Sequence, residues 1–323
     1  MSRSLSKPRI FIDGHAGTTG LRIREWLAGR ADLELLMLDE NERKSDAARQ
    51  KAIAEAAVSV LCLPDAEAAK AAEWAKQSGG RLIDASSYHR VAPGWVYGFP
   101  ELAPGQREAI GKAQLVSNPG CYPTPFIALV RPLVDAGLVR PDAPIGAHGL
   151  SGYSGGGKSM IESWEAKGQG RIGLHYEAPY ALERVHKHVP EMKRYAGLAH
   201  EPQFVPAVGP FACGMRVEVP LHQSLLPAGT RGEAVWQILA DRYRGERFVE
   251  VAPYTGLAPI DDFALDPCAL NDTNRMRLHV FPNPAGHLLL VGILDNLGKG
   301  ACGAAIQSLN LMLGLGEGAG LPT

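Results

Sequence analysis

The sequence lacks long apolar runs and an excess of charge of either sign. No stretch of about 18 consecutive apolar residues occurs, so we expect no membrane-spanning helix. Lysines and arginines number 33 against 34 aspartates and glutamates. The net charge of −1 gives no overall field that would recruit nucleic acid or an anionic membrane. The 37 glycines follow no period and 46% of the residues are hydrophobic, which excludes a fibre and a disordered chain.

Cysteine is also scarce. The five cysteines are odd in number, far apart and form no C-x-x-C pair, which argues against a disulfide framework and against structural zinc. The first segment, MSRSLSKPRIFID, has neither the apolar stretch nor the cleavage site of a signal peptide. We therefore expect reduced thiols, no bound metal and a cytoplasmic protein.

A length of 323 residues favours two domains over one. Up to residue 117, short apolar segments alternate with helical patterns, which predicts an α/β fold with a Rossmann-type, doubly wound parallel sheet. From residue 211, strands joined by a hairpin accompany a helix, which predicts a second α+β domain with a mixed or antiparallel sheet. We expect residues 1–118 with 300–323 to bind the cofactor, and residues 119–299 to carry catalysis, substrate binding and oligomerisation.

A glycine-rich turn, GHAGTTG at 14–20, follows the predicted strand 9–13 and precedes helical spacing over 21–27. It is a G-x-x-G-x-x-G variant of the dinucleotide fingerprint. In that fingerprint the glycines allow close backbone approach, and the helix start presents N–H groups to a pyrophosphate. A tight turn alone explains one or two of the glycines equally well, but the position after the first strand favours a nucleotide. The cofactor contacts predicted in this turn are Gly14, Gly17, Thr18, Thr19 and Gly20.

The second predicted strand, 33–38, ends in the charged run DENERK at 39–44. An acidic side chain here could bind a ribose hydroxyl, whereas Arg43 and Lys44 could bind a 2′-phosphate. A solvated charge run explains the segment equally well. Because the basic pair stands at the appropriate end of the strand, we favour NADP, with Arg43 as a contact. Two further cofactor contacts are predicted in the turns after another strand and before the last helix, at Ser86 and Asn296.

The segment SNPGCYPT at 117–124 places a cysteine at a special position. An extended run leads into a Pro-Gly turn, Cys121 follows, and Pro123 suits the first turn of a helix that continues to Val130. The dipole and the N–H groups of such a helix start stabilise a thiolate and can receive an oxyanion. We therefore predict that Cys121 is a nucleophile, with a space-filling thiol as the alternative.

A nucleophilic thiolate needs a proton carrier within reach. Among ten histidines, His186 and His188 in the segment RVHKHVPE at 184–191 are the best candidates. In an extended segment, their spacing would point both imidazoles the same way. We predict a catalytic role for both. Core or surface histidines are an alternative, and a metal site is a weaker one because no third ligand stands at metal-site spacing.

Four segments of the chain form one combined pattern. They are SNPGCYPT at 117–124, GLSGYSGGGK at 149–158, HKHVPE at 186–191 and NLGKGA at 296–301. Together they resemble the N-acetyl-gamma-glutamyl-phosphate reductase family in its shorter form, and the resemblance covers nearly the whole chain. The glycine turn departs from the family's frequent G-A-x-G-Y-x-G, because His15 and Thr18 stand at two of its positions.

The resemblance implies an enzyme of arginine biosynthesis, similar in fold and chemistry to aspartate-semialdehyde dehydrogenase. It would use NADPH to reduce an acyl phosphate to an aldehyde, release phosphate, and form a homodimer or homotetramer. In the implied mechanism Cys121 forms a thioester, and His188, oriented by His186, transfers a proton. Substrate contacts are expected from Asn118, Arg90, Ser154, Gly155 and Lys158, with ordinary surface charges as the alternative for the two cations.

The loop GYSGGGKS at 152–159 also matches the G-x-x-x-x-G-K-S loop of nucleotide hydrolases and kinases. We favour coincidence, because a better-placed nucleotide site stands near the start and no later strand ends in an aspartate suited to magnesium. The loop could still hold a substrate phosphate through backbone N–H groups. Three alternatives therefore remain: a P-loop ATPase or kinase, an activity like that of aspartate-semialdehyde dehydrogenase, and a non-enzymatic nucleotide sensor.

Overall fold

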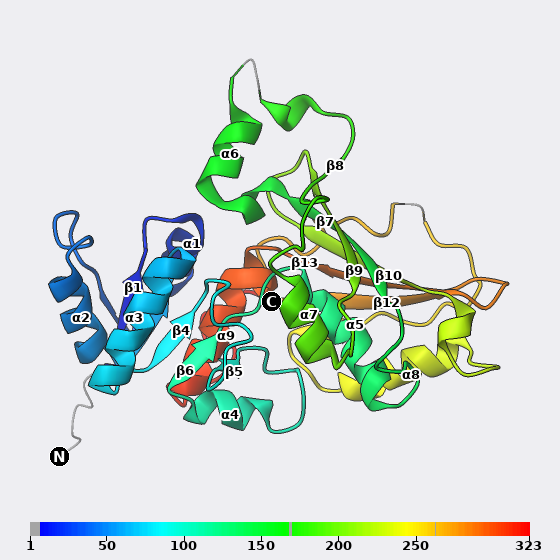
Figure 1. The fold of residues 1–323 in the computed structure, drawn as a ribbon, viewed down its shortest axis with the longest axis horizontal. Coiled ribbons are helices and arrows are strands. Elements are labelled where there is room, and N and C mark those ends of the chain that lie inside the picture. The colour runs from blue at the N-terminus through cyan, green and yellow to red at the C-terminus, as the bar shows by residue number, and fades with distance from the viewer. Residues whose placement is uncertain (1–6, 168–169, 262) are drawn as a thin grey trace. The chain divides into compact units, whose positions relative to one another are not determined.

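The structure is a computed structural model that describes residues 7–167, 170–261 and 263–323. The chain divides into two compact units, which are Met1–Pro119 with Ala301–Leu321, and Gly120–Gly300 with Pro322–Thr323. Each unit contains one β-sheet of its own (Figure 1).

The first unit contains a six-stranded sheet in which every pair of neighbouring strands is parallel. The order β2-β1-β3-β4-β6-β5 places β2 and β3 on opposite sides of β1, which is the switch point at which doubly wound sheets bind ligands. The predicted α/β fold with a doubly wound parallel sheet is confirmed. The edge strand β5 was not predicted. The strands are β1 Arg9–Asp13, β2 Glu34–Leu36, β3 Val58–Leu61, β4 Leu82–Asp84, β5 Val96–Tyr97 and β6 Leu115–Ser117.

Helix α3 illustrates how the helices of this unit pack. Four alanines recur at helical spacing from Ala68 to Ala75 and are fully buried, because their methyl groups allow close packing on neighbouring elements. The helix ends at Gly79, whose φ of 75° is the left-handed conformation typical of a helix C-terminus. The last helix, α9, contacts α1, α4, β3 and β4. The helices of this unit are α1 Thr18–Leu27, α2 Asp46–Glu55, α3 Asp65–Ser78, α4 Gln106–Lys112 and α9 Gly303–Met312.

The second unit contains a seven-stranded mixed sheet in the order β11-β12-β13-β10-β7-β9-β8. The pairs β7–β9 and β11–β12 are parallel and the other pairs are antiparallel. This arrangement confirms the predicted mixed sheet of a second α+β region. The strands are β7 Gly146–Gly152, β8 Ala178–Pro179, β9 Gln203–Gly209, β10 Met215–Leu221, β11 Val249–Val251, β12 Met276–Pro282 and β13 Leu288–Leu294.

Helix α5 lies at the centre of the second unit. Ten of its thirteen residues are buried, because its sequence is apolar on all sides and it packs on β10, β12, β13, α7 and α8. Figure 1 shows α5 and α7 beside each other, where the predicted catalytic segments lie. The helices of this unit are α5 Pro123–Asp135, α6 Gly157–Glu165, α7 Val189–Ala196 and α8 Gly232–Arg242, with short turns η1 Tyr153–Gly156, η2 Arg171–Gly173 and η3 Gln223–Leu225. The turn η4 Gly298–Cys302 begins in this unit and ends in the first.

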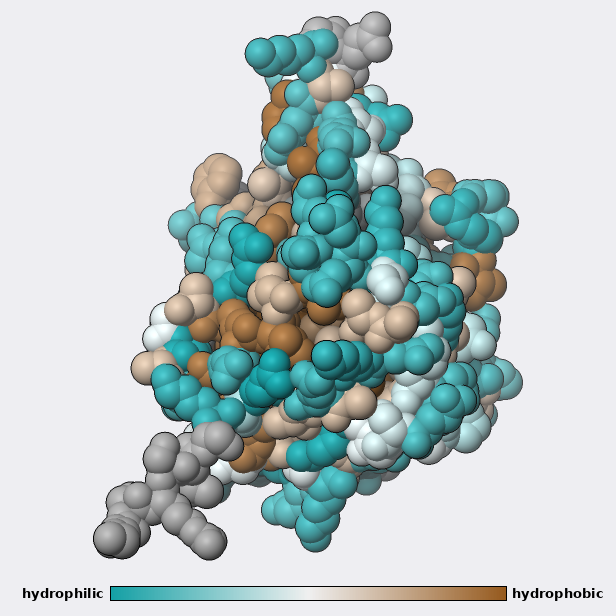
Figure 2. Space-filling view, turned by 90° about the vertical axis from the view of Figure 1, so that its left-hand side faces the viewer, coloured by the Kyte–Doolittle hydropathy of each residue, from teal (hydrophilic) through white to brown (hydrophobic). Residues whose placement is uncertain are grey.

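The surface is dominated by polar residues on the face drawn in Figure 2, where apolar residues form smaller patches. Among the helices of the described residues, none has both the length and the apolar character that crossing a membrane requires.

Candidate active site

The Pro-Gly turn holds Cys121 two residues before α5. The carbonyl oxygen of Gly120 accepts hydrogen bonds from the backbone N–H of Thr124 at 3.1 Å and from its hydroxyl at 2.9 Å. Pro123 occupies the first turn of the helix, where no amide proton is needed. Cys121 is half-buried, in contrast to the buried residues on both sides of it, so its thiol lies at an accessible helix start, as the sequence predicts.

The backbone of η4 passes directly beside Cys121. A Cβ atom at Gly300 would lie 2.9 Å from the Cβ of Cys121 and 3.1 Å from the carbonyl oxygen of Asp295. Only glycine fits at this position, since the two neighbours are a backbone carbonyl and the β-carbon of Cys121, neither of which can move freely. The turn η4 is a π-helix, an uncommon geometry that is frequent at functional sites.

The histidine pair lies beside the residue that follows Cys121. The segment is not an extended strand, because His188 has the helical angles φ −88° and ψ −14° and caps α7. The imidazoles of His186 and His188 nevertheless meet edge to face, with ring centroids 4.7 Å apart. Each ring centroid lies 5.9 Å from that of Tyr122. In the described part of the chain, no cluster of three or more His, Cys, Asp or Glu side chains is arranged to hold a metal ion.

Two tyrosines connect this pair to the cysteine turn. Nδ1 of His186 accepts the backbone N–H of His188 at 3.2 Å, and Nε2 of His186 lies 3.1 Å from the hydroxyl of Tyr180. Tyr122 donates its hydroxyl to the carbonyl oxygen of Ala207 at 2.9 Å. Burial raises the pKa of Tyr180 to about 12 and raises the pKa of Tyr122 well above its ordinary value. Both phenols are therefore protonated at neutral pH.

Glu191 links α7 to the cysteine turn. Its side chain is 1% exposed, and Oε2 accepts the backbone N–H of Gly120 at 3.0 Å. Glu191 stands in the first turn of α7, where the helix dipole favours a negative charge. The carboxylate therefore joins the helix capped by His188 to the residue before Cys121.

Asn296, which was predicted as a cofactor contact, holds the loop GYSGGGKS at 152–159 in place. The side-chain amide of Asn296 donates to Ser154 Oγ at 3.0 Å and accepts the backbone N–H of Gly214 at 2.8 Å. Gly155 follows on the exposed side of this contact. Lys158 lies on α6, where its side chain is 84% exposed and its Nζ lies 3.7 Å from Glu162. The structure thus brings Ser154, Gly155 and Asn296 together and leaves Lys158 on the surface.

In the first unit the glycine turn packs closely against backbone groups of the chain. Gly14 has φ +86°, and a Cβ there would lie 2.3 Å from the carbonyl oxygen of Cys62. A Cβ at Gly20 would lie 2.4 Å from the carbonyl oxygen of Gly14. Helix α1 begins at Thr18, three residues before the predicted start, and Gly17 caps it without a side-chain hydrogen bond. Thr18, Thr19 and Gly20 therefore form the first turn of α1, where N–H groups have no partner within the helix.

In the turn after β2, the side chain of Asp39 is used within the turn, whereas that of Arg43 stays accessible. Oδ1 of Asp39 accepts the backbone N–H groups of Asn41 at 2.8 Å and Glu42 at 2.9 Å, so this carboxylate closes its own turn. The guanidinium of Arg43 is 3.5 Å from Glu40 and about one-third exposed. Arg43 is therefore accessible to a ligand at this end of β2.

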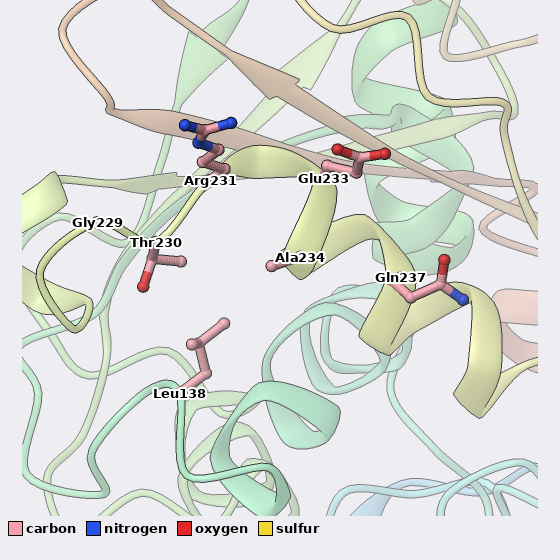
Figure 3. Close-up of a pocket in the computed structure, with 7 residues that line it drawn as sticks. All are labelled: Leu138, Gly229, Thr230, Arg231, Glu233, Ala234 and Gln237. Atoms are coloured by element: carbon pink, nitrogen blue, oxygen red, sulfur yellow. The ribbon is translucent and has the colours of Figure 1, made fainter.

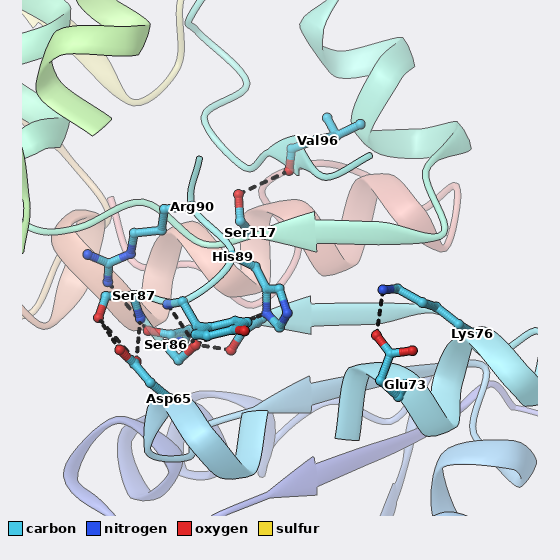
Figure 4. Close-up of polar contacts among 12 residues, drawn as sticks. Asp65, Glu73, Lys76, Ser86, Ser87, His89, Arg90, Val96 and Ser117 are labelled. Atoms are coloured by element: carbon cyan, nitrogen blue, oxygen red, sulfur yellow. Dashed lines mark hydrogen bonds and ion pairs between the residues drawn. The ribbon is translucent and has the colours of Figure 1, made fainter. Parts of the chain in front are cut away.

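The turn after β4 contains the predicted residues Ser86 and Arg90 (Figure 4). The buried carboxylate of Asp84 accepts the backbone N–H of Ser86 at 2.8 Å and its hydroxyl at 2.7 Å, and Nδ1 of His89 lies 2.6 Å from it. Arg90 is buried and donates to the carbonyl oxygen of Ala85 at 3.4 Å. Sequence reasoning did not find Asp84 and His89, although Asp84 ends a predicted strand.

Asn118, a predicted substrate contact, is 1% exposed. Its Nδ2 donates to the carbonyl oxygen of Ala301 at 2.9 Å, which fixes the orientation of the amide. Its Oδ1 has no hydrogen-bond partner among the residues that the structure describes. The amide thus offers a buried acceptor.

A pocket of about 470 Å³ lies elsewhere in the second unit, between the loop after α5 and the start of α8 (Figure 3). None of the predicted site residues lines it. The lining residues are Leu138, Gly229, Thr230, Arg231, Glu233, Ala234 and Gln237.

Two models of known families match most of the chain. The family described as "Semialdehyde dehydrogenase, NAD binding domain" matches residues 28–113, and "Semialdehyde dehydrogenase, dimerisation domain" matches residues 121–296. The chain thus contains a nicotinamide-nucleotide-binding region, and the second match indicates oligomerisation.

Among solved structures, aspartate semialdehyde dehydrogenase II of Vibrio cholerae complexed with ASA has a TM-score of 0.72 at 17% identity, covering 96% of this chain and 99% of that one. This likeness shows a shared fold.

Curated relatives are similar over almost their full length. The N-acetyl-gamma-glutamyl-phosphate reductase of Burkholderia ambifaria is 48% identical over 312 residues, which are 96% of this chain and 98% of the relative. N-acetyl-gamma-glutamyl-phosphate reductase 2 of Nostoc is 48% identical over 98% of this chain and all of the relative, and the corresponding enzyme 2 of Pseudomonas putida is 47% identical over 95% and 97%. The chain therefore belongs to the N-acetyl-gamma-glutamyl-phosphate reductase family.

Proposed function

We propose that this chain uses NADPH to reduce N-acetyl-gamma-glutamyl phosphate to N-acetyl-glutamate 5-semialdehyde with release of phosphate, a step of arginine biosynthesis. The observation that carries the proposal is the half-buried Cys121 at a helix start, followed by Tyr122, whose ring contacts two buried histidines, in a chain 48% identical to named reductases. These relatives favour this reaction over a P-loop ATPase and over a non-enzymatic nucleotide sensor.

The residues of the first unit fit a nicotinamide dinucleotide. The first turn of α1 opens without a side-chain cap, so its N–H groups suit a pyrophosphate, as predicted for Gly14, Gly17, Thr18, Thr19 and Gly20. Arg43 suits a 2′-phosphate, because Asp39 uses an oxygen within its own turn, and this supports NADP over NAD. When bound, the cofactor supplies the hydride. We assign residues 1–118 with 300–323 to cofactor binding, with Ser86 and Asn296 as further predicted contacts.

Cys121 begins the chemistry. Its thiolate attacks the acyl carbon, the S–C bond forms, and the bond to the phosphate oxygen breaks to leave a thioester. Pro123 and Pro125 remove two N–H groups from the start of α5, and the N–H of Thr124 donates to Gly120. We therefore assign the oxyanion to the backbone N–H of Tyr122, next to the nucleophile.

His188 supplies a proton later in the reaction. Reduction of the thioester leaves an oxyanion, to which His188 donates a proton to give the thiohemiacetal. When the thiohemiacetal collapses to the aldehyde, His188 takes the hydroxyl proton back, the C–S bond breaks, and Cys121 leaves as the thiolate. His188 carries the proton between these steps, since it caps α7 beside the cysteine turn. His186 orients the imidazole of His188, which its own ring meets edge to face.

Substrate contacts follow from the chemistry of each side chain. Arg90 and Lys158 suit the anionic groups of the substrate, and Ser154 with Gly155 suits the phosphate. The buried Oδ1 of Asn118 is an acceptor, so it suits an N–H donor such as the amide of the acetylated substrate and not the phosphate. We further propose that the chain acts in the cytoplasm as a homodimer or homotetramer, with residues 119–299 as the catalytic and oligomerisation domain.

The proposal is tested with the reverse reaction. Wild-type protein should reduce NADP with N-acetyl-glutamate 5-semialdehyde only when phosphate is present, and aspartate semialdehyde should be a poor substrate. Cys121→Ser should abolish turnover and leave NADP binding unchanged. Cys268→Ser is the matched control, because burial raises the pKa of the Cys268 thiol to about 11 and makes it a poor nucleophile. Full activity in Cys121→Ser would refute the mechanism, and equal rates with both semialdehydes would refute the assigned substrate.

A further inference from the structure

The glycine turn GHAGTTG at 14–20, which links β1 to α1 (Figure 1), contains one titratable side chain, that of His15. His15 stands at the position where the family frequently has alanine. The residue is half-buried, and it makes no hydrogen bond, ion pair or ring contact with the residues that the structure describes. Its imidazole is therefore available to a ligand.

The backbone of His15 lies against the start of α1. A Cβ atom at Gly20 would lie 2.8 Å from the Cα of His15. Leu21 is the first residue whose N–H bonds back along the helix, to Gly17 at 2.8 Å, so the N–H groups at 18–20 have no partner within the helix. A side chain as long as histidine, attached at position 15, can reach an anion that these N–H groups hold.

The charged groups next to the turn are engaged with one another. Arg49 of α2 lies 2.9 Å from the carboxylate of Asp13, the last residue of β1, and 2.7 Å from that of Glu67 on α3. Asp13 and Arg49 are both buried. A charge on His15 acts on Asp13, but the two residues form no ion pair. The imidazole of His15 is thus not held by this carboxylate.

The thiols packed on the turn carry no charge. Burial raises the pKa of the Cys62 thiol, directly after β3, to about 12. The thiol of Cys302 donates to the carbonyl oxygen of Thr19 at 3.5 Å. Helix α1 has no acidic residue in its first turn, and Arg24 lies in its last. No acidic side chain of the turn or of the helix start therefore competes with an anionic ligand for His15.

We propose that protonated His15 contacts the pyrophosphate of the bound dinucleotide, so that this chain binds its cofactor more tightly at acidic than at alkaline pH. Histidine gains its positive charge between pH 8 and 5, and a hydrogen bond between charged groups is stronger than a neutral one. The pyrophosphate stays anionic throughout that range. This inference rests on the proposed function and deepens it by naming a residue through which pH regulates cofactor affinity.

NAD is the appropriate probe for this effect. The 2′-phosphate of NADP gains a proton near pH 6, so its own titration would change the binding of NADP. NAD lacks this group, and a change in its Kd over the same range arises in the protein. The Kd is measured by isothermal titration calorimetry on the full chain without substrate, at constant ionic strength, because salt screens contacts between exposed charges.

The Kd for NAD should be about threefold to tenfold lower at pH 6 than at pH 8.5, since one charge-assisted contact to a half-exposed group is gained. His15→Gln should abolish this difference. His15→Arg should keep the low Kd at both pH values, because a guanidinium stays charged. Residue 15 does not have a positive φ, so both side chains suit its backbone.

His200→Gln is the matched control, because it removes an exposed histidine that lies after α7 in the second unit. It should keep the dependence of the Kd on pH. A Kd for NAD that is equal at pH 6 and pH 8.5 in the wild type would overturn the inference. The same conclusion follows if His15→Gln keeps the wild-type difference.

A spectroscopic measurement tests the contact in the unaltered chain. In protein labelled with ¹⁵N-histidine, the signals of His15 are those that His15→Gln removes. Saturating NAD should raise the midpoint of their titration by about half to one pH unit, because the pyrophosphate favours the protonated ring. This rise is the counterpart of the threefold to tenfold change in Kd. An unchanged or lowered midpoint contradicts the contact.

The two levels of the proposal fail in different ways. A chain that binds NAD with the expected pH dependence but does not reduce the acyl phosphate would refute the proposed function and keep the role of His15. A chain with reductase activity, whose affinity for NAD is independent of pH, would refute the role of His15 alone. Absence of binding to both NAD and NADP would refute both.

Discussion

The carboxylate of Glu191 accepts the backbone N–H of Gly120 at 3.0 Å, and this bond joins the helix that His188 caps to the turn that holds Cys121. Because Glu191 is 1% exposed, the bond forms out of contact with water. A buried donor that loses its acceptor costs about 1–3 kcal/mol. The relative placement of Cys121 and His188 therefore depends on this carboxylate.

Glu191→Ala should lower kcat on the order of tenfold or more and reduce the free energy of unfolding, because the N–H of Gly120 would be left buried without an acceptor. Glu191→Gln keeps an acceptor oxygen and should recover part of both. Turnover and urea denaturation measure the two effects. Glu233→Gln, in the first turn of α8 and exposed, is the control. Wild-type kcat in Glu191→Ala would show that the bond does not position the site.

Gly300→Ala should inactivate the enzyme, because the added Cβ would lie 2.9 Å from the Cβ of Cys121 and would displace it. Alkylation of Cys121 by iodoacetamide, followed by mass spectrometry, should slow in the same variant. Gly29→Ala is the control, since no atom lies within 4 Å of its added Cβ, and it should stay within about 0.5 kcal/mol of wild-type stability. Unchanged alkylation in Gly300→Ala would contradict the expected displacement.

Arg43→Ala should raise KM for NADPH by roughly tenfold to a hundredfold and change KM for NADH much less, because a charge-assisted contact to the 2′-phosphate would be lost. Steady-state kinetics with both cofactors measure this difference. Lys51→Ala removes a positive charge from the exposed side of α2 and should change neither constant. Equal effects of Arg43→Ala on both cofactors would assign Arg43 to the solvated surface.

The pair His148 and Glu218 should make stability depend on pH. The two residues are opposite each other on β7 and β10, and the hydrogen bond to Glu218 raises the pKa of His148 above 6.5, with a further contribution from Glu177. The same bond lowers the pKa of Glu218 below 4.5. The contribution of His148 is complete below pH 6.5 and is lost as pH rises through its raised pKa. That of Glu218 is complete above pH 4.5 and is lost as pH falls through its lowered pKa.

The contribution of the pair should therefore be greatest between pH 4.5 and 6.5. The Tm difference between wild type and His148→Gln should be largest in that range, at no more than about 3 °C, because the pair is partly exposed and screened by salt. Differential scanning calorimetry at fixed protein concentration measures it. A difference that is constant from pH 4 to 9 would contradict the expectation.

The sequence predicted the elements whose signals are local. The alternation of short strands and helices indicates the parallel sheet, and the Pro-Gly turn with Pro123 indicates the helix start beside Cys121. Both depend on residues adjacent in the chain. The start of α1 was placed three residues late, because Thr18 and Thr19 belong to the glycine turn in sequence and to the helix in hydrogen bonding.

Contacts between residues that are far apart in the sequence could not be predicted from local patterns. Tyr180 stands in no motif, and it contacts His186 only because β8 pairs with β9 and returns the chain to α7. Asp39 looks like a ribose ligand in sequence, but its oxygen is used by two N–H groups of its own turn. The structure likewise places Lys158 on an exposed helix, although its motif is that of a phosphate loop.

The close approach at position 300 is to the β-carbon of residue 121 and not to its sulfur. Serine and selenocysteine have the same β-carbon, so exchanging the reactive atom would create no space for a larger residue in η4. Attempts to install new chemistry at position 121 would thus still require glycine at position 300, whichever nucleophile is chosen.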